Sequence, residues 1–557
     1  MSHWIVAPVI LPALLAPLMA MAMRHDMVLQ RVFGLAGQVA MLAVAVGLAV
    51  HTYTTGEITI YELGAWRAPF GIVLVLDRLS AMMLVLTGAL GVIVALYAMG
   101  AGWDRRGWHF HALLLFQMMG VNGAFLTGDA FNLFVFFEVL LIASYGLMIH
   151  SGGAMRLRAG VQYVVMNLAG STLFLFALGT LYATLGTLNL ADMATRVAEL
   201  DPADAGLVAV GATLLLVVFA VKAAAFPVQF WLPDTYSNAP APAAAFFAIM
   251  TKVGAYAIIR VYTSVFGEAA PDLNAFLATL LLPAALATLI TGAVGVLGAR
   301  TLERMLAFAV LASMGTLLTA VALFTPTGLT AALYYVLHST LATAALFLTA
   351  DLVRSATRAG LRPHGLTVAL YFAGAIAMAG MPPLTGFLGK VFVLQAAAET
   401  PQGAWIWAII LTTSLFTIVG FTRMGSALFW KEAPDPADTD AAPALSTPSA
   451  LPALSAAIPL AALATITVAS GPVASAMQGT AAQLRDWPGY AAAVLDPPRH
   501  ADEGLVRGGG AYGGPAEDAE PAGDARGDAL EETRDDLGDA LDDAVEGALG
   551  GAAGGEE

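Results

Sequence analysis

Long apolar stretches recur along most of the chain, from Trp4 to about residue 475. Each is about as long as the roughly 20 residues that an α-helix needs to cross the hydrocarbon core of a bilayer. Dividing the apolar runs at their Pro, Gly and charged interruptions predicts about fourteen spans. Their centres lie near residues 13, 40, 85, 118, 140, 173, 218, 252, 286, 313, 340, 382, 416 and 462. The pattern therefore predicts an all-α polytopic membrane protein, with interruptions in the spans near residues 218 and 382.

Basic residues lie mainly in alternate loops between these spans. The loops that follow odd-numbered spans carry Arg24, Arg31, Arg105, Arg106, Arg156, Arg158, Arg300, Arg304, Arg354, Arg358, Arg362 and Lys431. The loops that follow even-numbered spans carry little beyond Arg67 and Arg196, and residues 192–204 are net acidic. Because cytoplasmic loops are enriched in Lys and Arg, this bias predicts that both termini lie outside the cytoplasm. We expect a bacterial inner-membrane protein with both termini in the periplasm or outside.

The composition narrows the possible functions. The chain is 59% hydrophobic and 12% charged, and it contains no cysteine. Without cysteine, disulfides, thiolate metal sites and cysteine-ligated iron–sulfur clusters are excluded. The sequence also shows no Walker loop, no HExxH and no nucleotide fingerprint. We therefore expect no cofactor, no metal site and no catalytic residue.

The net charge of −15 comes almost entirely from the C-terminal end. Residues 501–557 hold 17 acidic and 3 basic side chains, which leaves 23 acids and 22 bases in the rest of the chain. The Gly, Ala, Asp and Glu content after residue 497 predicts a mostly disordered acidic tail. Residues 528–549 space a few apolar side chains along one helical face. A solvated, partly helical tail is the favoured interpretation, and a docking helix is the alternative.

Four ionisable side chains lie inside predicted spans: Glu138, Lys222, Lys252 and Lys390. A charged side chain near the centre of a spanning helix costs at least a few kcal/mol on insertion scales, so such residues usually mark ion pathways. A static ion pair that fixes helix register would explain Glu138 and one lysine, but not three lysines. Lys252 could also extend its long side chain to the interface. We favour proton handling, because burial lowers the pKa of a lysine and a nearby carboxylate raises it again.

Prolines interrupt two of these spans. Pro227 follows Lys222 by five residues, and Pro382 and Pro383 precede Lys390. Proline removes a backbone donor, and irregular backbone at membrane depth is tolerated only where it is buried in protein or lines a polar cavity. Each of the two spans therefore combines a helix break with a lysine, and both breaks are expected on the cytoplasmic side of the lysine.

Other polar residues are weaker signals. His338 could relay protons between lysines, since its pKa lies near neutrality, but a hydrogen-bonded core histidine is about equally consistent with the sequence. Asp77 with Arg78, and Glu303 with Arg304, are expected to form local pairs near the membrane interface.

At these residues the sequence resembles the antiporter-like proton-translocating subunits of Mrp-type cation/proton antiporters and respiratory complex I. The resemblance covers roughly residues 60–430. Its most specific parts are VKAAAFPVQFWLPDTYSNAPAPAAAFFAIMTKVGAYAIIR, FNLFVFFEVLLIASYGLM and MPPLTGFLGKVFVL. The segment FGIVLVLDRLSAMMLVLTG is most similar to the D-type subunits of the Mrp antiporters.

This resemblance implies a fourteen-helix fold with two inverted five-helix repeats and broken helices seven and twelve. The implied boundaries are helices one to three in 1–110, the first repeat in 111–265, the second repeat in 270–432, a loop and helix fourteen in 433–496, and the acidic tail in 497–557. It also implies a hetero-oligomer with Mrp subunits of the A, B, C, E, F and G types, exchanging protons for Na⁺ or K⁺.

The resemblance implies a role for each polar residue. Glu138 and Lys222 correspond to the Glu–Lys pair of the proton uptake half-channel, and Lys252 to the connecting lysine. His338 corresponds to the central polar axis, and Lys390 to the terminal lysine of the release half-channel.

Two departures from the family pattern affect this interpretation. Many members carry a lysine shortly after the histidine, where this chain has Ala342 and Thr343, so the link between the two halves is expected to use water and His338. The M-type subunit of complex I carries Glu at the position of Lys390, which favours the Mrp antiporters, although the N-type subunit of complex I also has Lys there.

The alternative function is a proton-pumping subunit of a redox-driven complex such as complex I or a membrane-bound hydrogenase. A non-conducting scaffold subunit is the third possibility.

Overall fold

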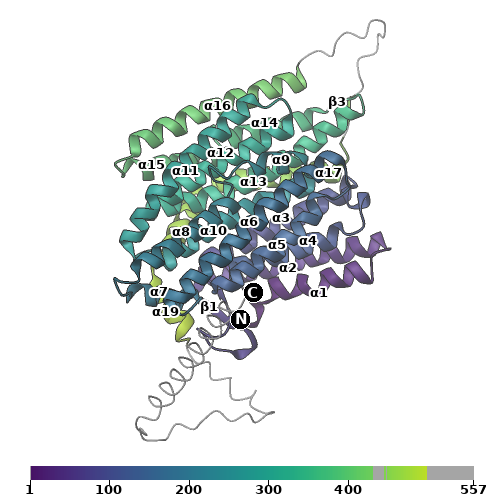
Figure 1. Cartoon of the computed structure of the whole chain (residues 1–557). Helices are drawn as coiled ribbons and strands as arrows, with labels where there is room; N and C mark the ends of the chain where they lie inside the picture. The colour runs from purple at the N-terminus through teal and green to yellow at the C-terminus, as the bar shows by residue number, and fades with distance from the viewer. Residues whose placement is uncertain (1, 431–444, 447, 498–557) are drawn as a thin grey trace, which may run out of the picture. The chain divides into compact units, whose positions relative to one another are not determined.

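A computed structural model describes residues 2–430, 445–446 and 448–497, which form a bundle of helices with two short strand pairs (Figure 1). The helices are α1 (Ala7–Met21), α2 (Met27–Thr55), α3 (Arg78–Gly100), α4 (Phe110–Leu126), α5 (Ala130–Met148), α6 (Ala154–Leu185), α7 (Leu190–Ala198), α8 (Ala205–Lys222), α9 (Trp231–Asn238), α10 (Ala241–Ser264), α11 (Pro271–Gly298), α12 (Leu302–Ala322), α13 (Pro326–Arg358), α14 (Gly365–Ala379), α15 (Thr385–Ala398), α16 (Gly403–Phe429), α17 (Ala450–Val468), α18 (Ser470–Arg485) and α19 (Trp487–Leu495). The predicted acidic tail, its candidate helix at 528–549 and Lys431 lie outside the described residues.

Eleven helices in the described ranges are long and apolar enough to cross a membrane: α2, α3, α5, α6, α8, α10, α11, α12, α13, α16 and α17. Each contains one of the predicted span centres. The predicted centres near residues 13 and 118 fall on the shorter apolar helices α1 and α4, and the centre near 382 falls between α14 and α15. The prediction of an all-helical polytopic membrane protein is confirmed.

Polar residues define where several of these helices begin. Asp26, Asp77 and Asp129 cap α2, α3 and α5, each accepting hydrogen bonds from backbone N–H groups of the first turn. Thr301 and Thr325 do the same for α12 and α13. Such caps satisfy backbone donors that the helix itself leaves free. The apolar helices therefore have defined starting points despite their uniform composition.

The centre of the bundle is formed by α10, α12 and α13. In an 18-residue apolar stretch of each helix, the buried share is 94% in α10, 94% in α12 and 89% in α13. The same share is 33% in α2, α16 and α17. α13 packs against α10, α12, α14, α15 and α17. A helix that is apolar all round and buried on all sides belongs to the interior of a membrane bundle. Polar side chains on α10, α12 and α13 are therefore shielded from lipid by the surrounding helices.

The two ends of the bundle carry different connections (Figure 1). At one end, which we call the hairpin end, an antiparallel pair of strands, β1 (Thr59–Glu62) and β2 (Val73–Leu76), lies near α7 and α19. At the opposite end, which we call the arginine end, β3 (Arg362–Pro363) pairs with β4 (Leu445–Ser446). The sequence pattern did not predict the hairpin between the second and third spans.

Two C-terminal helices, α17 and α18, run along the bundle. α17 is followed directly by α18, with Ala469 between them, and α18 packs against α13, α10 and α3. The Oε1 atom of Gln483 on α18 accepts a hydrogen bond from Arg78 N at 3.0 Å, and its Nε2 donates to Gly56 O at 3.1 Å. These contacts hold α18 against the hairpin end of α2 and α3.

Candidate proton-conducting site

The helix that carries Lys222 ends at that residue. α8 stops at Lys222 and α9 begins at Trp231, so Pro227 lies in the non-helical segment between them. Neighbouring side chains satisfy the freed backbone groups. Trp231 Nε1 donates to Val221 O at 3.1 Å, and Phe226 N donates to Thr288 Oγ1 on α11 at 2.7 Å. The break is therefore a hydrogen-bonded part of the structure, as irregular backbone at membrane depth requires.

Lys222 and Glu138 are connected through α6. The Lys222 ammonium is buried and donates to Asn167 Oδ1 at 3.3 Å and to Asn167 O at 3.4 Å. Ser171 Oγ contacts the Glu138 carboxylate and also lies 3.0 Å from Asn167 O. Within the described ranges, Glu138 and Lys222 make no direct ion pair. The two residues are therefore connected indirectly, through Ser171 and Asn167.

The polar side chains of α6 form a line at four-residue intervals. Tyr163, Asn167 and Ser171 share one face of the helix, because residues four apart lie one above another. Tyr163 OH lies 2.8 Å from Ser144 Oγ on α5, and Asn167 Nδ2 donates to Tyr163 O at 2.8 Å. The sequence pattern did not predict these three residues, although their four-residue spacing indicates a polar face on this helix of 32 residues.

Lys252 lies on α10 and is fully buried. In the part of the chain that the structure describes, its ammonium has one long hydrogen bond, to Thr251 Oγ1 at 3.5 Å. α10 packs closely on the break, since a β-carbon at Gly254 would lie 2.6 Å from Ala223 N. Only glycine allows the two backbones to approach in this way. Lys252 is therefore held beside the Lys222 segment without a strong partner of its own.

The second broken helix places its lysine after the break. α14 ends at Ala379, Pro382 and Pro383 follow, and α15 carries Lys390. Lys390 Nζ reaches back to donate to Ala379 O at 2.8 Å, and it also donates to Ser414 Oγ on α16 at 2.9 Å. The ammonium therefore joins both halves of the broken helix to α16.

Gly380 makes this return possible. Its φ of +77° continues the chain in the left-handed conformation that often ends a helix. A β-carbon at this position would lie 2.7 Å from Lys390 Cδ. The glycine therefore ends α14 and also leaves room for the lysine side chain.

His338 lies on α13. This helix packs against α15, which follows the second break, and against α10, which in turn packs against α8 before the first break. The ring is fully buried, with Nδ1 3.0 Å from Thr385 Oγ1 at the start of α15. Its Nε2 has no hydrogen-bond partner among the described residues. Buried polar atoms of this kind usually take a bound water as their partner.

Ala342 and Thr343 follow His338 on the same helix, at the positions where the sequence departs from the family pattern. Both are buried in α13. Thr343 Oγ1 has no partner within the described ranges, whereas Thr340 and Thr349 on the same helix donate to carbonyls four residues earlier, at 2.8 and 2.7 Å. Thr343 is therefore a polar group near the centre of the bundle that does not follow the usual pattern of helical threonines.

The charged residues near the span ends pair differently from the expectation. Asp77 pairs with Arg260 and not with its neighbour Arg78. Glu303 pairs with Arg354 on α13, and Arg304 pairs with Asp234 at 2.7 Å. The two expected local pairs are therefore wrong. Adjacent residues on a helix point in different directions, whereas these partners come from neighbouring helices.

Ion pairs also fix the arginine end. Arg31 on α2 donates to both oxygens of Asp104, at 2.6 and 2.9 Å. Burial raises the pKa of Asp104, but hydrogen bonds from His111 and Arg31 together with the Arg31 charge outweigh it and lower the pKa to about 2. Asp104 therefore stays ionised at any physiological pH.

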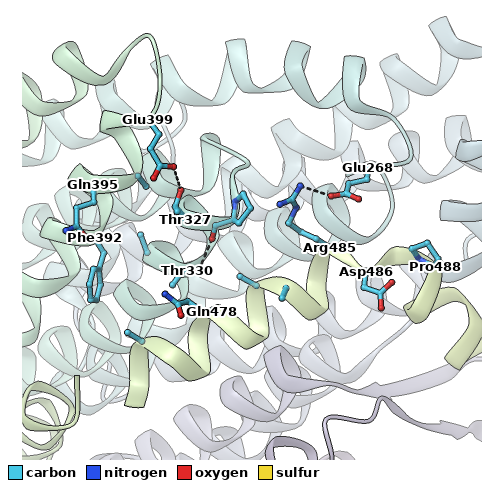
Figure 2. A pocket seen from close by; sticks show the side chains of 16 residues that line it. Glu268, Thr327, Thr330, Phe392, Gln395, Glu399, Gln478, Arg485, Asp486 and Pro488 are labelled. Carbon is cyan, nitrogen blue, oxygen red and sulfur yellow. Dashed lines mark hydrogen bonds and ion pairs between the residues drawn. The ribbon is translucent and has the colours of Figure 1, made fainter. Parts of the chain in front are cut away.

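A cavity of about 1020 Å³ lies at the hairpin end, between the start of α13, the end of α15 and α18 (Figure 2). Thr327 donates to Glu399 at 2.8 Å, and Arg485 donates to Glu268 at 2.6 Å. None of the predicted proton-site residues lines it. The cavity is thus separate from the candidate proton site.

Comparison with known proteins identifies the family. Residues 127–417 match the family described as NADH:quinone oxidoreductase/Mrp antiporter, TM. The chain is 38% identical to the D subunit of a probable K⁺/H⁺ antiporter of Rhizobium meliloti, covering 77% of this chain and 87% of that protein. It is also 38% identical to the D subunit of the Na⁺/H⁺ antiporter of Alkalihalophilus pseudofirmus, covering 78% of this chain and 88% of that protein.

The fold agrees with these sequence matches. A chain in the structure of the Mrp complex from Dietzia superimposes with a TM-score of 0.80 at 28% identity, covering 89% of this chain and all of that chain. The chain therefore belongs to the NADH:quinone oxidoreductase/Mrp antiporter family. Within that family it is a D-type subunit of a Mrp antiporter. Of the two transport functions considered from the sequence, the similarity favours the antiporter over the redox-driven complex.

Proposed function

We propose that this chain conducts protons in a Mrp-type antiporter that exchanges protons for Na⁺ or K⁺. In this proposal it belongs to a secondary transporter, and protons are taken up at Glu138 and Lys222, pass Lys252 and His338, and are released at Lys390. The observation that carries the proposal is the burial of these groups. Lys222, Lys252 and His338 are buried and Lys390 is partly buried, on helices that pack around α10 and α13. Buried ionisable groups in series are expensive for a scaffold and are the usual mark of a proton path.

The connection between Glu138 and Lys222 supports a role in proton uptake. Ser171 and Asn167 lie between the carboxylate and the ammonium. Asn167 contributes only acceptor oxygens, so the connection does not itself carry a proton. It holds the Glu138 carboxylate near Lys222, so that the charge of one group affects the protonation of the other. Lys222 is held by long hydrogen bonds to a neutral amide, which leaves it free to change protonation state.

We place bound water between the two halves, at His338 and at Thr343. Nε2 of His338 and Oγ1 of Thr343 are both buried in α13 and have no partner among the described residues. Residues five apart on a helix lie about 140° apart around its axis, so each atom would need its own water. The water at His338 Nε2 would extend the path from Lys252 toward Lys390. In this proposal the water replaces the lysine that many relatives carry near Ala342.

The proposed topology has fourteen spans. α8 with α9 forms broken helix seven, and α14 with α15 forms broken helix twelve. The hairpin end then faces the outside and the arginine end the cytoplasm, in agreement with the arginine-rich loops of the arginine end. Two inverted five-helix repeats and the domain boundaries given above are part of this proposal. The partners are the other members of a Mrp complex, of the A, B, C, E, F and G types.

The proposal is tested by replacing Lys222 with Ala in the assembled complex and measuring cation-dependent proton flux in membrane vesicles. We expect the flux to be lost, because Lys222 is the ammonium that Asn167 holds on the path from Glu138. The matched control is Arg196→Ala, which removes an exposed cation at the hairpin end and should leave flux unchanged. Undiminished flux in a normally assembled Lys222→Ala complex would refute the assigned role and favour the scaffold.

A further inference from the structure

A second group of buried charges lies outside the proposed path. Arg260 on α10 and Asp77 at the start of α3 are each 2% exposed. The guanidinium contacts both carboxylate oxygens, with Arg260 Nη2 2.9 Å from Asp77 Oδ1. Burying such a pair is costly and often no more stabilising than apolar packing. The presence of this pair at the hairpin end of α10 therefore needs an explanation.

The hydroxyls around this pair are arranged so that they cannot relay a proton. Tyr256 OH accepts from Arg260 Nε at 3.2 Å and donates to Phe125 O at 2.8 Å. Ser80 Oγ accepts from Arg260 Nη2 at 3.1 Å and donates to Phe125 O at 2.5 Å. A guanidinium does not release its proton in proteins, and a backbone carbonyl has none to pass on. Each hydroxyl therefore lies between a donor that keeps its proton and an acceptor that ends the chain.

The position of this group relative to Lys252 is set by the helix. Lys252, Tyr256, Arg260 and Ser264 follow one another at four-residue intervals along α10, so they lie on one face. At 1.5 Å per residue, Arg260 is about 12 Å from Lys252 along the helix axis, toward the hairpin end. The ring of Tyr490 on α19 also lies near this guanidinium, with Arg260 Cζ 5.9 Å from the ring centre. Without Arg260, this face would offer a row of polar groups from Lys252 to the hairpin end.

We propose that Arg260, Asp77, Tyr256 and Ser80 form a proton barrier, which closes the hairpin end of α10 so that a proton on Lys252 passes to His338 instead of leaving directly. The inference rests on the proposed function, because it assumes that Lys252 carries protons. A direct escape from Lys252 would dissipate the proton gradient without using the second half of the path. Because the pair with Asp77 is neutral overall, the barrier depends on a guanidinium that keeps its protons and not on electrostatic repulsion.

The surroundings of Lys390 differ in the way that this proposal requires. A small cavity of about 10 Å³ lies beside Lys390, which is about the space for one water. Its polar lining consists of Lys390 and the hydroxyl-bearing residues Ser313, Thr316, Tyr335, Thr413 and Thr417. No arginine lines this cavity in the described part of the chain. Lys390 thus has a polar cavity beside it, whereas the face of α10 beyond Lys252 ends at a guanidinium.

The test measures passive proton leak through the assembled complex in sealed vesicles, with a pH gradient imposed and no transported cation present. The first variant is Arg260→Lys, which keeps a positive charge opposite Asp77 but introduces a group that can release its proton. The second is Arg260→Gln with Asp77→Asn, which removes both charges and leaves no unpaired ion. We expect the leak to rise on the order of tenfold in either variant, equivalent to about 1.4 kcal/mol of barrier.

The matched control is Arg31→Gln with Asp104→Asn, which neutralises an ion pair at the arginine end and should leave the leak at the wild-type level. If the Arg260 variants assemble and show no added leak, the pair is only a structural clamp and the barrier is refuted. Should the double variant fail to assemble, Arg260→Lys decides alone. A leak that stays low while Lys222→Ala abolishes coupled flux refutes this inference and leaves the proposed function intact. Undiminished flux in Lys222→Ala refutes the proposed function whatever the leak.

Discussion

Lys222 is the last residue of α8, before the first break, whereas Lys390 lies on α15, after the second break. The freed backbone at the first break is satisfied by neutral groups, Trp231 Nε1 and Thr288 Oγ1. At the second break the lysine itself donates to the carbonyl of Ala379, the last residue of α14. The comparison shows two ways to stabilise an interrupted helix in a membrane, one independent of the lysine and one that depends on it.

This difference has a consequence for the two ammonium groups. The end of a helix carries a partial negative charge on its free carbonyls, so the C-terminus of α14 attracts the Lys390 ammonium. Lys222 also ends its own helix, but its hydrogen bonds go sideways to Asn167 at 3.3 and 3.4 Å. Lys390 is therefore expected to contribute to both folding and transport, and Lys222 mainly to transport.

The largest expected contrast is in stability. Replacing Lys390 with Met leaves the buried carbonyl of Ala379 without its donor, which should cost about 1.5–3 kcal/mol, the usual range for a charged hydrogen bond. Replacing Lys222 with Met removes a buried charge with only long hydrogen bonds, and should change stability by less than about 1 kcal/mol. The measurement is the midpoint of thermal unfolding of the purified complex, which does not depend on transport activity. Equal midpoints, or a lower midpoint for Lys222→Met, would contradict the expectation that only the second break depends on its lysine for stability.

The next prediction tests whether Lys390 needs the space that Gly380 leaves beside it. Gly380→Ala places a β-carbon 2.7 Å from Lys390 Cδ and should push the ammonium away from Ala379 O, lowering coupled flux. Alanine in the left-handed conformation also costs about 1 kcal/mol by itself. Gly360→Ala is the matched control, because Gly360 has a similar φ of +69° but open space around its α-carbon. Flux that falls equally in both variants would show that backbone strain, not displacement of Lys390, is responsible.

The sequence predicted the charged residues of the candidate site but not the neutral side chains that contact them. Glu138 and Lys222 could be predicted because a charge inside a long apolar run has few explanations. The contacts of Ser171 and Ser414 could not be predicted. The spacing of Asn167 and Ser171 indicates a polar face on α6 but not what it contacts, and serines and threonines usually bond to a carbonyl of their own helix. Nothing in the sequence shows that Ser171 also reaches Glu138, 33 residues away, or that Ser414 reaches Lys390.

Partners distant in the sequence also account for the wrong pairs. Asp77 was expected to pair with its neighbour Arg78, yet its partner Arg260 lies 183 residues later. Order along the chain and hydropathy fixed the spans, so the eleven long apolar helices and most of the bundle could be predicted. Which face of one helix meets which face of another depends on packing, and a single sequence does not record it.

The smallest expected effect tests whether the neutral partners matter at all. Ser171→Ala removes the hydroxyl between Glu138 and Asn167, and the loss of one hydrogen bond of about 1 kcal/mol should slow coupled proton flux about fivefold. Thr172→Ala is the matched control, because Thr172 is the next residue on α6 but is exposed and donates only to Leu168 O of its own helix. Ser414→Ala should have a smaller effect than Ser171→Ala, because Lys390 keeps its bond to Ala379 O. If Ser171→Ala and Thr172→Ala both transport at the wild-type rate, Glu138 and Lys222 communicate by another route, and the indirect connection through α6 is a packing feature only.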